Sequence, residues 1–144
     1  MKKKNVIWTL AMGVILAMPL SGQATGMVSI NMCYQDAGED PEKIGACLDK
    51  ELKLVQAEHK DVTERVTVIA KAWDKPNRNR VRWEKLMRSN QAFDNYMKRE
   101  CDFVKSTTKG NARHETNAQL ACRINLYRMR TDMLENRFLS SARE

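Results

Sequence analysis

Apolar residues between Asp40 and Pro76 recur with a period of about 3.6 positions, which is typical of an amphipathic α-helix. The stripe consists of Ile44, Cys47, Leu48, Leu52, Val55, Val62, Val66, Ile69 and Trp73. Asp40 stands at a preferred N-cap position, and Pro41 stands at the first helical position. Because proline cannot continue a helix, the pattern predicts one long helix that starts at Pro41 and ends before Pro76.

A polar loop separates two further stretches of helical spacing between Arg80 and Phe138. The stripe before the loop is Val81, Leu86, Asn90, Phe93, Met97, Cys101 and Val104, and the stripe after it is Ala118, Ala121, Cys122, Leu126, Met129, Met133 and Leu134. The loop, 106–114, contains Gly110-Asn111 in a polar run that interrupts helices. Thr116 or Asn117 is expected to cap the following helix. The pattern predicts an antiparallel helix pair.

Three amphipathic helices can bury their apolar stripes against one another, and no segment alternates in the manner of a strand. We therefore expect an all-α fold, an antiparallel three-helix bundle, in a single domain over 25–144. Residues 25–39 are expected to form an irregular lead-in. The side chains expected in or against the core of the helix pair are Trp83, Phe93, Tyr96 and Leu134.

The first 24 residues have the three parts of a secretory signal peptide. Lys2, Lys3 and Lys4 precede an apolar run over 6–20, and Gly22-Gln23-Ala24 follows it. We expect cleavage after Ala24, with Gly26 as the alternative. A retained membrane anchor is disfavoured because the run is shorter than the ~20 residues that a spanning helix needs. The lysine-rich start is typical of bacteria, and the expected location is the periplasm.

All four cysteines lie beyond the predicted signal: Cys33, Cys47, Cys101 and Cys122. An even number of cysteines in an exported chain indicates two disulfides. Of the three pairings, we expect Cys33–Cys47 and Cys101–Cys122, because each closes a short loop. Free or metal-bound cysteines are the alternative, but there is no C-x-x-C, and neither His59 nor His114 stands at zinc-ligand spacing from a cysteine. No metal or cofactor is expected.

Charge is distributed unevenly along the chain. Residues 27–64 carry a net charge of −5 and residues 65–144 carry +9, so that the chain without residues 1–24 has a net charge of +4. Solvated helix faces are the ordinary explanation. Nucleic-acid binding is the alternative for the basic half, but export and the lack of a nucleic-acid-binding motif disfavour it.

The sequence contains no recognisable catalytic motif. There is no G-x-S-x-G, H-E-x-x-H or phosphate-binding glycine loop. Glu51 and Glu58 could share a helix face, but nothing in their spacing makes them an acid–base pair. His59 interrupts an apolar stripe and is expected at the edge of the core. We therefore expect a binding protein and not an enzyme.

The cysteines and aromatic residues of the three helical segments resemble those of the LprI-type lysozyme-inhibitor family. That family has a cysteine before a long helix, then Q-x-x-W-x-x-Y-R-x-x-x-C, then a later cysteine followed by T-x-x-R-x-x-x-L. The matching residues here are Cys47, Tyr96, Cys101, Cys122, Arg130 and Leu134, whereas Asn90, Phe93, Met97 and Tyr127 replace the usual residues. The resemblance implies a small, exported, bacterial helical domain over 25–144.

The same resemblance implies a protein partner, namely lysozyme or another muramidase, which the protein would block. The expected contact is the loop region Lys105–Glu115, with Lys109 and Arg113 as the binding cations; the acidic helix face around Glu51, Glu58 and Asp61 is the alternative. Nucleic acid is not expected as a partner, nor is membrane insertion after signal cleavage. The alternative function is an immunity or envelope-interaction protein without effect on lysozyme.

Overall fold

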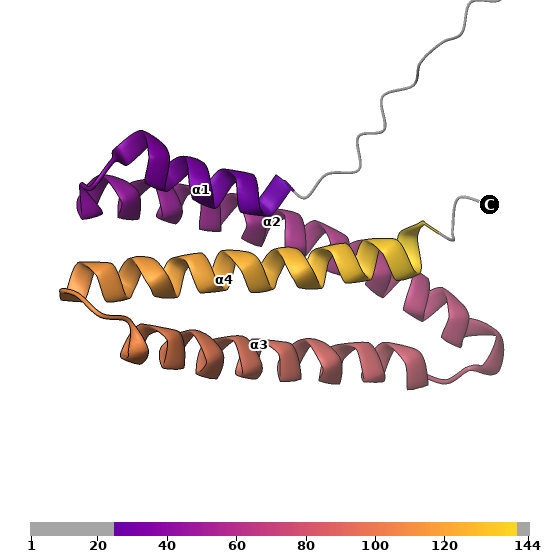
Figure 1. Ribbon diagram of the computed structural model, residues 1–144. Coiled ribbons are helices and arrows are strands. Elements are labelled where there is room, and N and C mark those ends of the chain that lie inside the picture. Colours follow the sequence, from indigo (N-terminus) through magenta and orange to yellow (C-terminus); the bar gives the residue numbers. More distant parts are fainter. Residues whose placement is uncertain (1–24, 141–144) are drawn as a thin grey trace, which may run out of the picture.

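The computed structural model describes residues 25–140, so the predicted signal peptide, 1–24, lies outside the described residues. Within that range the chain forms four α-helices: α1 (Thr25–Ala37), α2 (Pro41–Asp74), α3 (Val81–Thr107) and α4 (Ala112–Leu134). A 3-10 turn (Lys75–Asn77) follows α2, and a π-helical turn (Glu135–Leu139) follows α4. Helix α4 contacts the other three helices, and Figure 1 shows it between α1 and α3.

The all-α prediction is confirmed, but the described part of the chain has a fourth helix where an irregular lead-in was expected. Helix α1 buries Ile30 and Cys33, and Ala37 packs beside them. This three- and four-residue spacing is a short apolar stripe, and a helix of this length is not stable without tertiary contacts. Helix α1 is therefore stabilised by packing on α2 and α4, which its own sequence pattern could not show.

The interior consists of two apolar clusters. The first contains Ile30, Cys33, Ile44, Leu48, Leu52, Val55, Leu120 and Ile124, and the second contains Val62, Val66, Leu134 and Leu139. Between them along α2 and α4 lie His59 and Thr131, whose Nδ1 and Oγ1 atoms are 3.1 Å apart. A polar layer thus separates two apolar cores, and the prediction of His59 at the edge of the core agrees with its half-buried position.

A buried carboxylate joins the end of α2 to the start of α3. Asp74 accepts hydrogen bonds from the backbone N–H groups of Arg82, at 3.1 Å, and Trp83, at 3.0 Å. Its side chain is only 4% exposed and also pairs with the Arg82 guanidinium. The first N–H groups of a helix have no partner within the helix. Asp74 satisfies two of them from outside α3, where no local side chain does so.

Helix α3 is the least buried of the long helices, with Met97 and Cys101 as its fully buried residues. Leu134 of α4 is buried as expected, and Trp83 and Phe93 are partly buried. The prediction that Tyr96 packs against the core is wrong, because its side chain is 53% exposed. None of the helices in 25–140 combines the length and the apolar character that crossing a bilayer requires.

Candidate binding tip beside a disulfide

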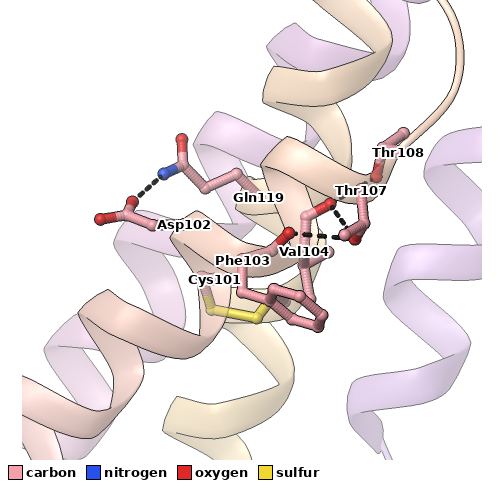
Figure 2. The surroundings of a disulfide bond; sticks show 8 residues. Cys101, Asp102, Phe103, Val104, Thr107, Thr108 and Gln119 are labelled. Atoms are coloured by element: carbon pink, nitrogen blue, oxygen red, sulfur yellow. Dashed lines mark hydrogen bonds between the residues drawn. A yellow bond between two sulfur atoms is a disulfide. The ribbon is translucent and has the colours of Figure 1, made fainter.

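The loop between α3 and α4 is shorter than the predicted 106–114 and spans only Thr108–Asn111. Helix α3 continues further because hydroxyl groups satisfy its last carbonyls. Thr107 Oγ1 donates to the Phe103 carbonyl at 3.0 Å, and Thr108 Oγ1 donates to the Val104 carbonyl at 2.7 Å. Figure 2 shows these bonds beside the disulfide. We call the four-residue connection, Thr108–Asn111, the tip loop.

The Cys101–Cys122 disulfide joins the two helices behind the tip loop (Figure 2), with its Cα atoms 5.6 Å apart. Gln119 Nε2 donates to Asp102 Oδ1 at 2.7 Å, so a hydrogen bond accompanies the covalent link. The predicted pairing of all four cysteines is confirmed, since Cys33–Cys47 is the second disulfide and no cysteine within residues 25–140 is free. The two helices that flank the tip loop are therefore joined by a covalent bond and by a hydrogen bond.

Asn111 caps α4, so the prediction of a cap at Thr116 or Asn117 is wrong. Asn111 Oδ1 accepts from the backbone N–H groups of Arg113 and His114, at 2.9 and 3.1 Å. The preceding Gly110 has φ +132°, which a residue with a side chain rarely adopts, and a Cβ atom there would meet the His114 ring. The N-cap thus ties the end of the tip loop to the first turn of α4, and Gly110 supplies a backbone conformation that other residues rarely adopt.

Lys109 and Arg113, the two predicted binding cations, lie in different settings. Lys109 is exposed in the tip loop, and no carboxylate within residues 25–140 pairs with it. Arg113 lies in the first turn of α4, where its Nη2 atom is 2.9 Å from Glu42 Oε2 and its side chain is 31% exposed. It also covers Gly45, where an added Cβ atom would lie 2.6 Å from the guanidinium. Arg113 therefore contributes to the packing of α4 on α2, and the binding role of both cations stays a prediction.

Acidic residues lie in the α1–α2 turn, at the same end of the molecule as the tip loop (Figure 1). Asn117 Nδ2 donates to the Pro41 carbonyl at 2.8 Å and fixes this arrangement. The exposed carboxylates in and beside the turn are Asp36, Glu39 and Glu42. The end of the molecule thus presents one exposed loop lysine near an acidic turn.

The alternative acidic face of α2 is less open than the sequence indicates. Glu51 forms an ion pair with Arg128 of α4, and both side chains are largely buried, at 15% and 17% exposure. Glu58 is exposed, and Asp61, which pairs with Arg65 on its own helix, is exposed as well. A partner on this face would therefore meet Glu58 and Asp61 at the surface, whereas Glu51 is engaged inside the fold.

An apolar groove of about 590 Å³, which the spacing of apolar residues did not predict, lies between α1, α3 and α4. Tyr34, Tyr96 and Met129 line it, with exposures of 41%, 53% and 66%. Helical spacing placed Met129 on a stripe, and Tyr96 was expected against the core, but both side chains lie outside the contact between α3 and α4. In the described chain, no group of His, Cys, Asp or Glu residues has the arrangement of a metal site.

Comparison of the chain with protein-family models, with curated proteins and with solved structures found no match. The resemblance to the LprI-type family therefore depends on the cysteine and aromatic pattern alone.

Proposed function

We propose that this chain is an exported, periplasmic LprI-type binding protein that inhibits a lysozyme-like muramidase by inserting its tip loop into the catalytic cleft. Muramidases cleave a glycosidic bond between two carboxyl groups. A lysine ammonium group that enters such a cleft can form charge-assisted hydrogen bonds with them. The proposal includes cleavage of residues 1–24 as a signal peptide.

The observation that carries the proposal is the exposed Lys109, which pairs with no carboxylate of residues 25–140, in a loop whose two ends are bonded to the helices. The loop is held by the Cys101–Cys122 disulfide, by the Asn111 cap and by hydroxyl groups at the end of α3. A loop that is already ordered loses little conformational entropy on binding, which favours affinity. Lys109 is therefore the better candidate of the two predicted cations, since Arg113 is already paired with Glu42.

The charge around the loop supports the same type of partner. Animal lysozymes are cationic as a class, and the net charge of this chain gives no long-range attraction to them. The acidic α1–α2 turn beside the tip loop supplies local complementarity to a basic protein surface, while Lys109 is complementary to an acidic cleft. One end of the molecule thus presents both charge signs, which supports the proposal.

The proposal is tested by titrating several purified muramidases with the wild-type protein and with two single variants. Lys109→Ser removes the loop cation, and Lys53→Ser removes an exposed lysine of α2 as the matched control. We expect Lys109→Ser to weaken inhibition tenfold or more, as for the loss of one member of a desolvated charge pair, and Lys53→Ser to inhibit like the wild type. Full activity of every muramidase at micromolar wild-type protein would remove the inhibitor proposal.

A second candidate function is an immunity or envelope-interaction protein, and the groove lined by Tyr34, Tyr96 and Met129 favours it. Exposed aromatic and methionine side chains in a groove are typical of surfaces that bind protein partners. Tyr96→Ser would weaken binding of such a partner and leave inhibition of a muramidase by the tip loop unchanged. The two candidate functions therefore predict different results: Lys109→Ser would weaken muramidase inhibition, and Tyr96→Ser would weaken binding of an envelope or toxin partner.

A further inference from the structure

The end of the molecule opposite the tip loop has a concentrated positive charge. Between Lys71 and Arg88 the sequence has seven basic and two acidic residues. Both carboxylates are paired, Asp74 with Arg82 and Glu84 with Arg88. The remaining cations are Lys71, Lys75, Arg78, Arg80 and Lys85; all five are exposed, and none forms an ion pair with a carboxylate of residues 25–140. This stretch therefore carries five cations without a carboxylate partner among residues 25–140.

The two tryptophans of residues 25–144 lie in the same region. Trp73 is 48% exposed at the end of α2. Trp83, in the first turn of α3, has Lys71 Nζ at 5.7 Å and the Arg80 guanidinium carbon at 5.9 Å from its ring centre. We call these two tryptophans and the five unpaired cations the hinge patch.

A cleft of about 400 Å³ opens within the hinge patch. Lys71, Lys75 and Arg80 line it beside Trp83. The Asp74 carboxylate also lies there, but it is engaged by two backbone N–H groups of α3 and by Arg82. The cations that face the cleft therefore remain available to a bound anion.

We propose that the hinge patch binds the surface of anionic phospholipid membranes. Basic side chains accumulate at anionic leaflets, where each contributes to the affinity. Tryptophan prefers the headgroup region because its ring is apolar and its N–H group is polar. Duplex nucleic acid would require the cations without explaining an exposed indole beside them, so a lipid surface accounts for both features; a single strand, whose bases can stack on an indole, is the competing occupant that the test separates. Such adsorption is peripheral and involves no spanning helix.

The arrangement leaves the tip loop away from the membrane. Helix α3 runs from the hinge patch to the tip loop, and its 27 residues correspond to about 40 Å of helix. Figure 1 shows the α2–α3 connection and the tip loop at opposite ends of the bundle. A membrane-bound molecule would thus present the tip loop to the aqueous space. The proposal does not depend on the identity of the tip-loop partner.

The test uses the protein purified from a periplasmic extract, with its N-terminus established by mass spectrometry. Vesicles of phosphatidylcholine with or without phosphatidylglycerol are sedimented with it, and tryptophan emission is recorded in parallel. With residues 1–24 removed, Trp73 and Trp83 are the whole source of this emission. We expect binding to the anionic vesicles, with a blue-shifted emission, and weak binding to the neutral ones.

Two charge-matched triple variants identify the surface. Lys71→Gln, Lys75→Gln and Arg80→Gln together remove three cations of the hinge patch and are expected to weaken vesicle binding about a hundredfold, given about fivefold per charge. Lys50→Gln, Lys53→Gln and Lys60→Gln remove three exposed cations of the acidic half, and this control is expected to bind nearly as well as the wild type. Circular dichroism and thermal melting show whether both variants are folded.

Three results would overturn the proposal. They are equal binding to neutral and anionic vesicles, equal losses in the two folded triple variants, and tighter binding to duplex or single-stranded DNA than to anionic vesicles at the same phosphate concentration. If the hinge-patch variant does not fold, the single change Trp73→Ser takes its place, and unaltered vesicle binding by that variant would also contradict the inference.

Discussion

Single polar side chains determine how the helices of this protein meet. Asp40 caps α2 from the adjacent position, with its Oδ1 atom accepting from Glu42 and Lys43, and the sequence predicted this. Asp74 caps α3 from eight and nine residues away, through the turn that follows α2. A cap of this kind depends on the path of the turn, so a search for local capping signals could not find it.

The first prediction concerns Asp74. Burial alone would raise its pKa, but the N–H groups of Trp83 and Arg82 and the Arg82 charge outweigh it and lower the pKa below the ordinary 3.8. Because the folded state favours the carboxylate, this stabilisation is present above about pH 4 and is lost as the pH falls through the folded-state pKa. Asp74→Asn should lower the melting temperature at pH 7, with the difference from wild type shrinking towards pH 3. An equal difference at both pH values would contradict the capping role.

The second prediction concerns His59, whose pKa is lowered by burial and by the charge of Arg130, while Asp94 partly opposes the shift. The unfolded chain takes up a proton near the ordinary value of 6.5, and the folded protein does so only at lower pH. The free energy of unfolding should therefore fall as the pH drops from 7.5 towards 5. His59→Gln should flatten this dependence, measured by urea denaturation.

His114 supplies the matched control for that measurement, because it is exposed and is the other of the two histidines in the chain. His114→Gln should retain the wild-type fall in stability below pH 7. If the two variants show the same pH dependence, His59 is not the responsible group.

At the scale of helices, the sequence was sufficient to predict a helix and its bounds where the apolar period extends over many residues and capping or proline residues mark both ends. Helix α2 starts at Pro41, as its cap and proline predicted, and α3 starts at Val81. The short α1 was not predicted, and neither was the continuation of α3 and α4 into the predicted loop. They depend on packing against α2 and α4 and on hydroxyl groups that bond to backbone carbonyls, and neither appears in apolar spacing.

The two disulfides and the tip lysine show how far the candidate site could be predicted. Both pairings followed from short spacing, and Lys109 is exposed in the loop. The engagement of Arg113 with Glu42 and Gly45 was not predictable, because it needs the α1–α2 turn to lie beside the tip loop. Sequence spacing identified the loop, and tertiary packing determined which of its cations is available.

The third prediction concerns the disulfide behind the tip loop. Replacing Cys101 and Cys122 together by Ser should lower the free energy of unfolding by about 2–5 kcal/mol, the usual cost of losing a native disulfide in a small secreted domain. Chemical denaturation measures this loss. Backbone amides of 108–113 should also exchange faster with solvent, since the base of the loop loses its covalent link. Unchanged exchange there would mean that hydrogen bonds alone hold the loop.

At the scale of the whole molecule, the uneven charge along the sequence corresponds to two ends of different charge. The acidic α1–α2 turn lies beside the tip loop, and the hinge patch lies at the other end of α3. Composition could show that the chain had an acidic and a basic half. It could not show that five of the cations without a carboxylate partner in residues 25–140 lie near two tryptophans, because this depends on the ion pairs that the fold forms.

The most direct test of the proposed function is the steady-state kinetics of an inhibited muramidase on a soluble oligosaccharide. If the tip loop occupies the catalytic cleft, increasing concentrations of the protein should raise the apparent KM and leave kcat unchanged, and Lys109→Ser should shift the inhibition constant tenfold or more. A fall in kcat at constant KM, or no inhibition at any concentration, would contradict the account.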